Sequence, residues 1–138
     1  MGLPILIGCV MIIITTIIHS AMTRIVVYMN ETQSNSSLAV LQQNHIPVWL
    51  TMTVLIIFCA TILESVIWTF CYLYIGAIGS LEEALYFSLV TFTTLGYGDI
   101  ILNENWRLLS SIQAVNGIII FGWSTAILIA TVQRLHSK

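Results

Sequence analysis

The chain has 138 residues, of which 58% are hydrophobic and only 7% are charged, and its mean hydropathy is +0.98. Because soluble domains carry about 25% charged residues, this composition excludes an ordinary soluble protein and predicts one compact membrane protein. The net charge of −2 arises from four basic and six acidic residues, which form no basic patch, so nucleic-acid binding is excluded.

The first predicted element is a membrane-spanning helix within residues 1–24. Its apolar run, residues 3–23, would be about 32 Å long as a helix, against a hydrocarbon core of about 30 Å. The run lacks a basic start and a small-residue cleavage site, which favours a retained helix over a signal peptide. His19 lies close to its predicted end, where a hydrogen-bonded or exposed histidine is favoured over a pH sensor.

A polar connector is predicted over residues 25–47 and a second spanning helix over 48–75. Glu64 is the one acid inside a spanning run, and such acids suggest function because they are costly in a membrane. Trp68, Tyr72 and Tyr74 follow within three turns and are interpreted as an aromatic belt at the outer interface. Glu64 is therefore expected either to reach the interface or to pair with a neighbouring helix.

A short helix is predicted over residues 81–92, where the sequence reads "SLEEALYFSLVTF" from Ser80. Ser80 and Glu83 have the spacing of a capping box, which indicates the start of this helix. The helix is too short to cross a bilayer and is followed by the glycine-rich loop "TTLGYGD", residues 93–99, and by another spanning run, 108–133. This order predicts a re-entrant hairpin, which a membrane tolerates only where protein or a water-filled cavity surrounds it.

The loop at residues 93–99 can present a row of backbone oxygens. A row of carbonyls that point the same way requires alternate residues in the left-handed region, which glycine adopts freely, and Gly96 and Gly98 alternate. One strand cannot enclose an ion, but four around an axis can replace the hydration shell of a monovalent cation.

These features resemble the potassium channels, whose filter contains a Thr-x-Gly-Tyr-Gly loop. The short bacterial two-helix members have the same order: outer helix 48–75, pore helix 81–92, filter 93–99 and inner helix 108–133, within a pore domain at 48–138. The resemblance implies an all-α membrane protein that forms a homotetramer, with three transmembrane helices per chain and K+ as the permeant ion. The helix in residues 1–24 lies outside this pattern and is expected at the periphery.

The resemblance also implies roles for individual residues. K+ would bind at Thr94, Leu95, Gly96 and Tyr97, and Gly98 would complete the filter, with Leu95 standing where Val or Ile is commonest. Thr93 and Asp99 would support the filter. Behind it, Tyr86 and Phe87 stand where the family commonly has two Trp, and Val90 stands where the best-studied bacterial members have a Glu. The packing around Tyr97 is therefore expected to be looser, with Tyr86 a candidate hydroxyl donor. Asp99 is expected to be an exposed carboxylate or to be held by a neighbouring subunit.

Gly117 falls where the family has its gating hinge, although a close-packing role is the alternative. Polar residues along the inner helix, Asn116, Ser124, Thr125 and Thr131, are expected to line a cavity or to bond between helices. A filter near the outer mouth would place the N-terminus outside and the C-terminus in the cytoplasm, with three of the four basic residues inside. Glu82 and Glu83 would then either concentrate cations at the outer mouth or cap the pore helix.

The sequence therefore predicts a passive potassium-selective channel of the cell membrane, in contact with lipid and with no small-molecule substrate other than K+. It contains no catalytic constellation, so an enzyme is not expected. Two alternatives remain open: a weakly selective monovalent cation channel, and a non-conducting partner that regulates another channel.

Overall fold

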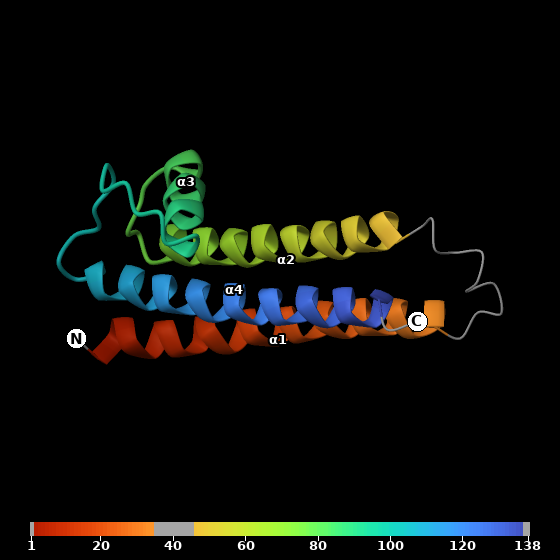
Figure 1. Cartoon of the computed structure of the whole chain (residues 1–138). Helices are drawn as coiled ribbons and strands as arrows, with labels where there is room; N and C mark the ends of the chain where they lie inside the picture. The colour runs from red at the N-terminus through yellow and green to blue at the C-terminus, as the bar shows by residue number, and fades with distance from the viewer. Residues whose placement is uncertain (1, 35–45, 137–138) are drawn as a thin grey trace.

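The computed structural model describes residues 2–34 and 46–136, which form four helices and no strand, so the all-α prediction is confirmed. They are α1 (Gly2–Ser34), α2 (Ile46–Tyr74), α3 (Leu81–Phe92) and α4 (Arg107–His136). Figure 1 shows α1, α2 and α4 side by side and the short α3 across one end of this bundle. The N-terminus lies at the α3 end and the C-terminus at the opposite end (Figure 1).

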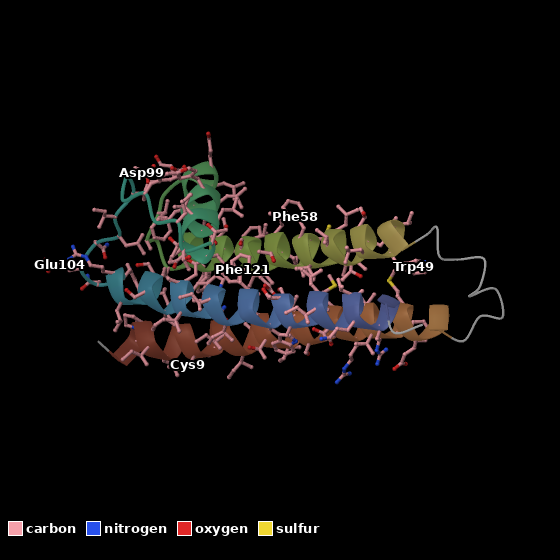
Figure 2. All side chains as sticks on the ribbon, viewed as in Figure 1. Cys9, Trp49, Phe58, Asp99, Glu104 and Phe121 are labelled. Atoms are coloured by element: carbon pink, nitrogen blue, oxygen red, sulfur yellow. The ribbon has the colours of Figure 1, made fainter. Side chains whose placement is uncertain are left out.

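The three long helices, α1, α2 and α4, are long and apolar enough to cross a membrane. Their outer faces carry apolar side chains, as Phe58 on α2 and Cys9 on α1 illustrate by projecting away from the bundle (Figure 2). In water such faces would be costly, whereas lipid tails solvate them. The chain is therefore a membrane protein.

Helix α1 is longer than the sequence predicts, because it continues from residue 24 to Ser34, ten residues further. Residues 25–34 contain neither glycine nor proline, the residues that most often end a helix, so the predicted boundary at the first polar residues was wrong. Residues 35–45 of the predicted connector lie outside the described residues. As a consequence, His19 lies near the middle of α1 and not near its end.

Helix α1 packs against α2 and α4, on the far side of the bundle from α3 (Figure 1). A small residue permits part of this contact, because a Cβ at Gly8 would come within 2.8 Å of the Ile112 side chain on α4. Asn116 of α4 also donates a hydrogen bond to Thr15 Oγ1 of α1, over 2.8 Å. This places Asn116 between helices, which is one of the two roles that the sequence left open.

The cap predicted for α3 is present. Ser80 has extended backbone angles, φ −118° and ψ 145°, and its side chain accepts a hydrogen bond from the Glu83 amide over 3.1 Å. Glu82 and Glu83 lie in the first turn, exposed, where carboxylates interact favourably with the positive end of the helix dipole. The capping interpretation of this segment therefore has a structural basis, and the outer-mouth role stays a prediction.

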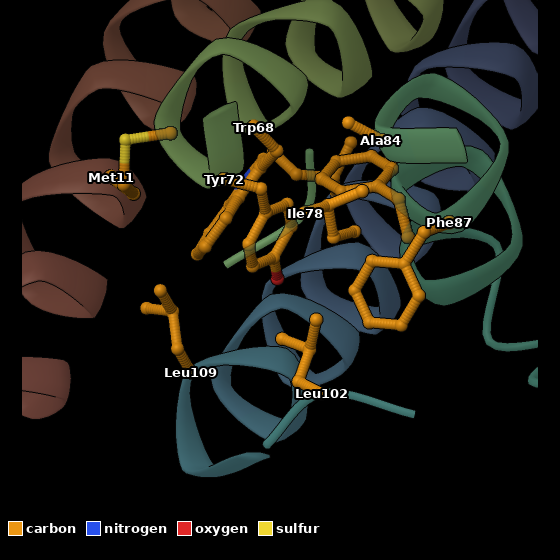
Figure 3. Close-up of a cluster of buried hydrophobic side chains, with 10 residues drawn as sticks. Met11, Trp68, Tyr72, Ile78, Ala84, Phe87, Leu102 and Leu109 are labelled. Atoms are coloured by element: carbon orange, nitrogen blue, oxygen red, sulfur yellow. The ribbon is translucent and has the colours of Figure 1, made fainter. Parts of the chain in front are cut away.

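The apolar core lies where α3 packs against α2 and α4, and Met11 of α1 extends it on the other side of α2 (Figure 3). Trp68 and Tyr72 of α2 are fully buried there, between Met11 of α1 and Phe87 of α3. The predicted aromatic belt was therefore wrong for these two residues, because α3 folds back and covers their face of α2. Tyr74, by contrast, is 94% exposed.

A buried polar network fastens α3 to its neighbours. The Tyr72 hydroxyl of α2 donates to Gln113 Oε1 of α4 over 2.7 Å, and Gln113 Nε2 donates to Ser88 Oγ of α3 over 2.8 Å. Ser88 in turn donates to the Ser65 carbonyl of α2 over 2.7 Å. All four side chains, those of Ser65, Tyr72, Ser88 and Gln113, are buried, and each makes at least one hydrogen bond. The network therefore helps to specify how α3 packs and leaves none of the four polar side chains without a partner.

Candidate functional site

The loop after α3 has the alternating backbone that a row of carbonyl oxygens requires. Gly96 and Gly98 have positive φ values of 53° and 78°, as the sequence predicts. Thr94 also has a positive φ of 61°, which the sequence did not predict because a β-branched residue rarely adopts it. Every second residue from 94 to 98 is thus left-handed, and Thr94 holds strain of the kind that collects at functional sites.

Hydrogen bonds to the end of α3 hold this backbone in place. The Val90 carbonyl accepts from the amides of Leu95, over 3.0 Å, and Gly96, over 3.2 Å. The Thr94 amide donates to the Thr91 carbonyl over 3.0 Å, and the Thr93 hydroxyl donates to the Leu89 carbonyl over 2.8 Å. The last carbonyls of a helix lack partners within the helix, so they are available to fasten the loop. Val90, predicted as a packing residue, thus contributes through its backbone.

Asp99 has a partner in its own chain. The Tyr86 hydroxyl donates to Asp99 Oδ2 over 2.6 Å, and the Ile100 amide donates to Oδ1 over 3.1 Å, at the exposed tip of the hairpin (Figure 2). Asp99 is exposed, as the sequence predicts, but its carboxylate has a partner in its own chain because the Tyr86 hydroxyl reaches it. Support of Asp99 by a neighbouring subunit stays a prediction. This hydrogen bond lowers the pKa of Asp99 and raises the pKa of Tyr86.

Phe87, the other residue predicted behind the filter, packs into the core. Its ring lies edge-on against Tyr72, with centroids 5.2 Å apart and planes at 83°.

The loop side chains Leu95 and Tyr97 are 56% and 67% exposed in the single chain. An open groove of about 360 Å³ lies beside the loop, lined from α3, from the loop and from α4 by residues that include Val90, Thr94, Gly98, Arg107, Ser111 and Ile118.

Gly117 lies where α3 ends on α4. A Cβ at this position would lie 1.9 Å from the Phe92 carbonyl oxygen, so only glycine permits this approach of the two backbones. Helix α4 is continuous from Arg107 to His136, through Gly117. The contact supports the packing interpretation, and the hinge stays a prediction.

Sequence reasoning missed the network around Gln113, and it named His19 and Glu64 without predicting that they meet. These two lie 3.1 Å apart, between α1 and α2. Pairing with a neighbouring helix was one of the two expectations for Glu64. A polar residue inside an apolar spanning run was the available signal, and it applied to Gln113 as well.

Comparison with known proteins identifies the channel unit. A model of a family described as ion channel matches residues 48–134, which include nearly all of α2, the whole of α3 and the loop, and most of α4. Helix α1 lies outside the match. Searches of curated proteins and of solved structures give no match. Because the match covers more than half of the chain, the protein belongs to the ion channel family and carries its channel domain at residues 48–134.

Proposed function

We propose that the protein is a potassium-selective channel that conducts K+ passively, through a filter formed by residues 94–98 of four chains. The observation that carries the proposal is the alternation of positive φ at Thr94, Gly96 and Gly98. Such a backbone turns successive carbonyls toward one side, where they can take the place of the water around K+. The K+ ligands are then oxygens of Thr94, Leu95, Gly96 and Tyr97.

The filter works because its oxygens are held before the ion arrives. The bonds to the Val90 carbonyl fix the loop, and Tyr86 fixes the carboxylate of Asp99 at its outer end. A cation that sheds its water then meets oxygens that need little rearrangement. One chain leaves the loop open on one side, as the exposure of Leu95 and Tyr97 indicates, so four copies in cyclic symmetry are proposed to complete the pathway.

The charge distribution supports an orientation in the cell membrane. The start of α1, the helix α3 and the start of α4 lie at one end of the bundle, and the later parts of α1 and α4 lie toward the other (Figure 1). By their positions in these helices, the exposed Glu82, Glu83 and Arg107 share the filter end, whereas Arg24 and Arg134 lie toward the opposite end. Because basic residues concentrate on the cytoplasmic side, we place the filter outside and the C-terminus inside. The two glutamates would then raise the local concentration of cations at the mouth.

The test is ion flux through the purified protein in liposomes, with reversal potentials in mixed K+ and Na+. We expect selective K+ flux that is lost in Gly98→Ala, because alanine is strained at a φ of 78°. Gly79→Ala is the control, since a Cβ there would contact nothing within 4 Å and Gly79 lies outside the filter. Equal K+ and Na+ permeability would favour the weakly selective channel, which the inward packing of Phe87 supports. Silence from assembled tetramers would favour the regulatory partner.

A further inference from the structure

Three buried side chains, one from each of the three long helices, meet inside the bundle. His19 of α1, Glu64 of α2 and Ser124 of α4 are 1%, 0% and 4% exposed. Nδ1 of His19 lies 3.1 Å from Glu64 Oε1, and Nε2 lies 3.4 Å from Ser124 Oγ. All three residues lie within the stretches that can cross a membrane. A buried acid beside a buried base in that setting points to function, because each is costly unless the two are paired.

Both ring nitrogens of His19 face oxygen atoms. The Ser124 hydroxyl donates its hydrogen to the Ile120 carbonyl over 2.9 Å, so its oxygen faces Nε2 as an acceptor. Glu64 Oε1 is an acceptor toward Nδ1. Both ring nitrogens therefore face acceptors, which suits the imidazolium, the one form of histidine with two N–H donors. Imidazolium and carboxylate together form a pair with no net charge.

Gain or loss of one proton leaves this pair with a buried net charge. Loss converts His19 to neutral imidazole beside the Glu64 carboxylate, which leaves −1. Gain protonates Glu64 Oε2, which is buried without a hydrogen-bond partner among the described residues, and leaves +1. Trp68 Nε1, one turn along α2, is buried in the same unpartnered state. The junction can thus bind or release a proton, and each change removes its neutrality.

No charged group in the described part of the chain is placed to compensate for that change. Helix α4 faces the pair with the uncharged Ser124 and with the Trp123 ring, whose centroid lies 5.2 Å from that of His19. Apart from Glu64, the charged residues of the three long helices are exposed: Arg24 and Glu31 on α1, and Arg107 and Arg134 on α4. The two on α4 lie at or near its ends.

We propose that His19, Glu64 and Ser124 form a proton-binding site, and that its protonation controls how firmly α1 holds the inner helix α4. The same seam contains a second contact, from Asn116 to Thr15, directly beside Gly117. Helix α4 also borders the groove at the loop through Ser111 and Ile118. A weaker hold of α1 on α4 therefore reaches the conduction pathway, a step that rests on the proposed function, whereas the proton-binding site does not.

The protonation state is tested first, without ion flux, by nitrogen NMR of histidine-labelled full-length protein in lipid bilayers. His19, assigned by the loss of its signal in His19→Gln, is expected to be imidazolium near pH 7 and neutral imidazole in the isosteric Glu64→Gln. Ser124→Ala is expected to lower the imidazolium fraction without abolishing it. A neutral His19 in the native chain, or an imidazolium that persists in Glu64→Gln, would overturn the site.

The coupling to α4 is tested by K+ flux between about pH 4 and pH 9, on both sides of the ordinary histidine pKa. We expect the open–closed equilibrium of the native chain to shift about fivefold or more across this range, the usual size of coupling between two sites. His19→Gln and Glu64→Gln should remove this dependence. Thr15→Val, which breaks the uncharged contact of the same seam, should retain it. The same dependence in all variants, or none in the native chain, would overturn the coupling, while absence of any flux would refute the proposed function and leave the NMR result standing.

Discussion

The network around Gln113 provides a quantitative test of how the buried polar groups of α2, α3 and α4 are held together. Tyr72→Phe leaves Gln113 Oε1 without its donor, and Gln113→Leu leaves the buried Tyr72 hydroxyl without its acceptor. Each orphaned group costs about 1–3 kcal/mol of unfolding free energy. Ser88 keeps its bond to the Ser65 carbonyl in both variants, so the loss stays local. The bonds from Gln113 Nε2 to Ser88 are lost equally in Gln113→Leu and in the double variant, so they cancel in the comparison. In the double variant neither the Tyr72 hydroxyl nor Gln113 Oε1 is left without its partner, so we expect it to lose about 1–2 kcal/mol less than the sum of the single losses.

The measurement is a double-mutant cycle on reversible unfolding of the protein in mixed micelles with sodium dodecyl sulfate. Ser110→Ala is a suitable control, because the Ser110 hydroxyl donates to the Arg107 carbonyl of its own helix and not to a residue of the network. We expect this variant to change the unfolding free energy by less than about 0.5 kcal/mol. Single losses that add to within about 0.5 kcal/mol in the double variant would show that the hydrogen bond from Tyr72 to Gln113, which joins α2 to α4, does not stabilise the network to which α3 is attached.

Three further predictions follow from the hairpin. Gly117→Ala should destabilise the fold by about 1–3 kcal/mol, because the added Cβ would overlap the Phe92 carbonyl oxygen and force two helix backbones apart. Gly122→Ala, whose Cβ would meet nothing within 4 Å, should be neutral or stabilising in thermal unfolding. Tyr86→Phe should return the pKa of Asp99 toward its ordinary 3.8, as NMR titration of the carboxylate would report, and an unchanged pKa would contradict the hydrogen bond as its cause. In the native chain this hydrogen bond stabilises the fold fully between the ordinary pKa of Asp99, 3.8, and the ordinary pKa of Tyr86, 10.0, so its contribution should be constant from about pH 4 to pH 10. The contribution is lost on the acid side as the pH falls through the lowered pKa of Asp99, and on the basic side as the pH rises through the raised pKa of Tyr86. A change in filter behaviour near neutral pH that survives Tyr86→Phe would therefore have to arise elsewhere in the chain.

The elements that the sequence predicts well are those whose signals are local. The length of an apolar run decides whether a helix can span, and the pair Ser80 and Glu83 marks the start of α3 wherever that helix then packs. The positive φ of Gly96 and Gly98 can likewise be predicted, because glycine adopts such values freely. Thr94 does not, because its positive φ depends on hydrogen bonds to α3 that overcome its own preference.

Partners of buried polar groups could not be predicted, because they depend on how each helix is rotated about its axis. Gln113 and Asn116 are three residues apart, which places them about 60° apart around α4. This difference is enough for Gln113 to face α2 and α3 while Asn116 faces α1. The same reason explains why Glu64 left two interpretations open until α1 was placed beside it.

Thr94 connects the packing of the bundle to the proposed selectivity. A β-branched residue at a φ of 61° costs about 1–3 kcal/mol, and it persists only where the surroundings hold it. The amide bonds from Leu95 and Gly96 to the Val90 carbonyl supply that hold, each worth about 0.5–1.5 kcal/mol, so the two sides are nearly balanced. Because the balance depends on where the end of α3 lies, a residue that fixes α3, such as Gln113, acts on the filter without touching it. Loss of K+ selectivity in Gln113→Leu, with selectivity kept in the control Gly79→Ala, would be the signature of this connection.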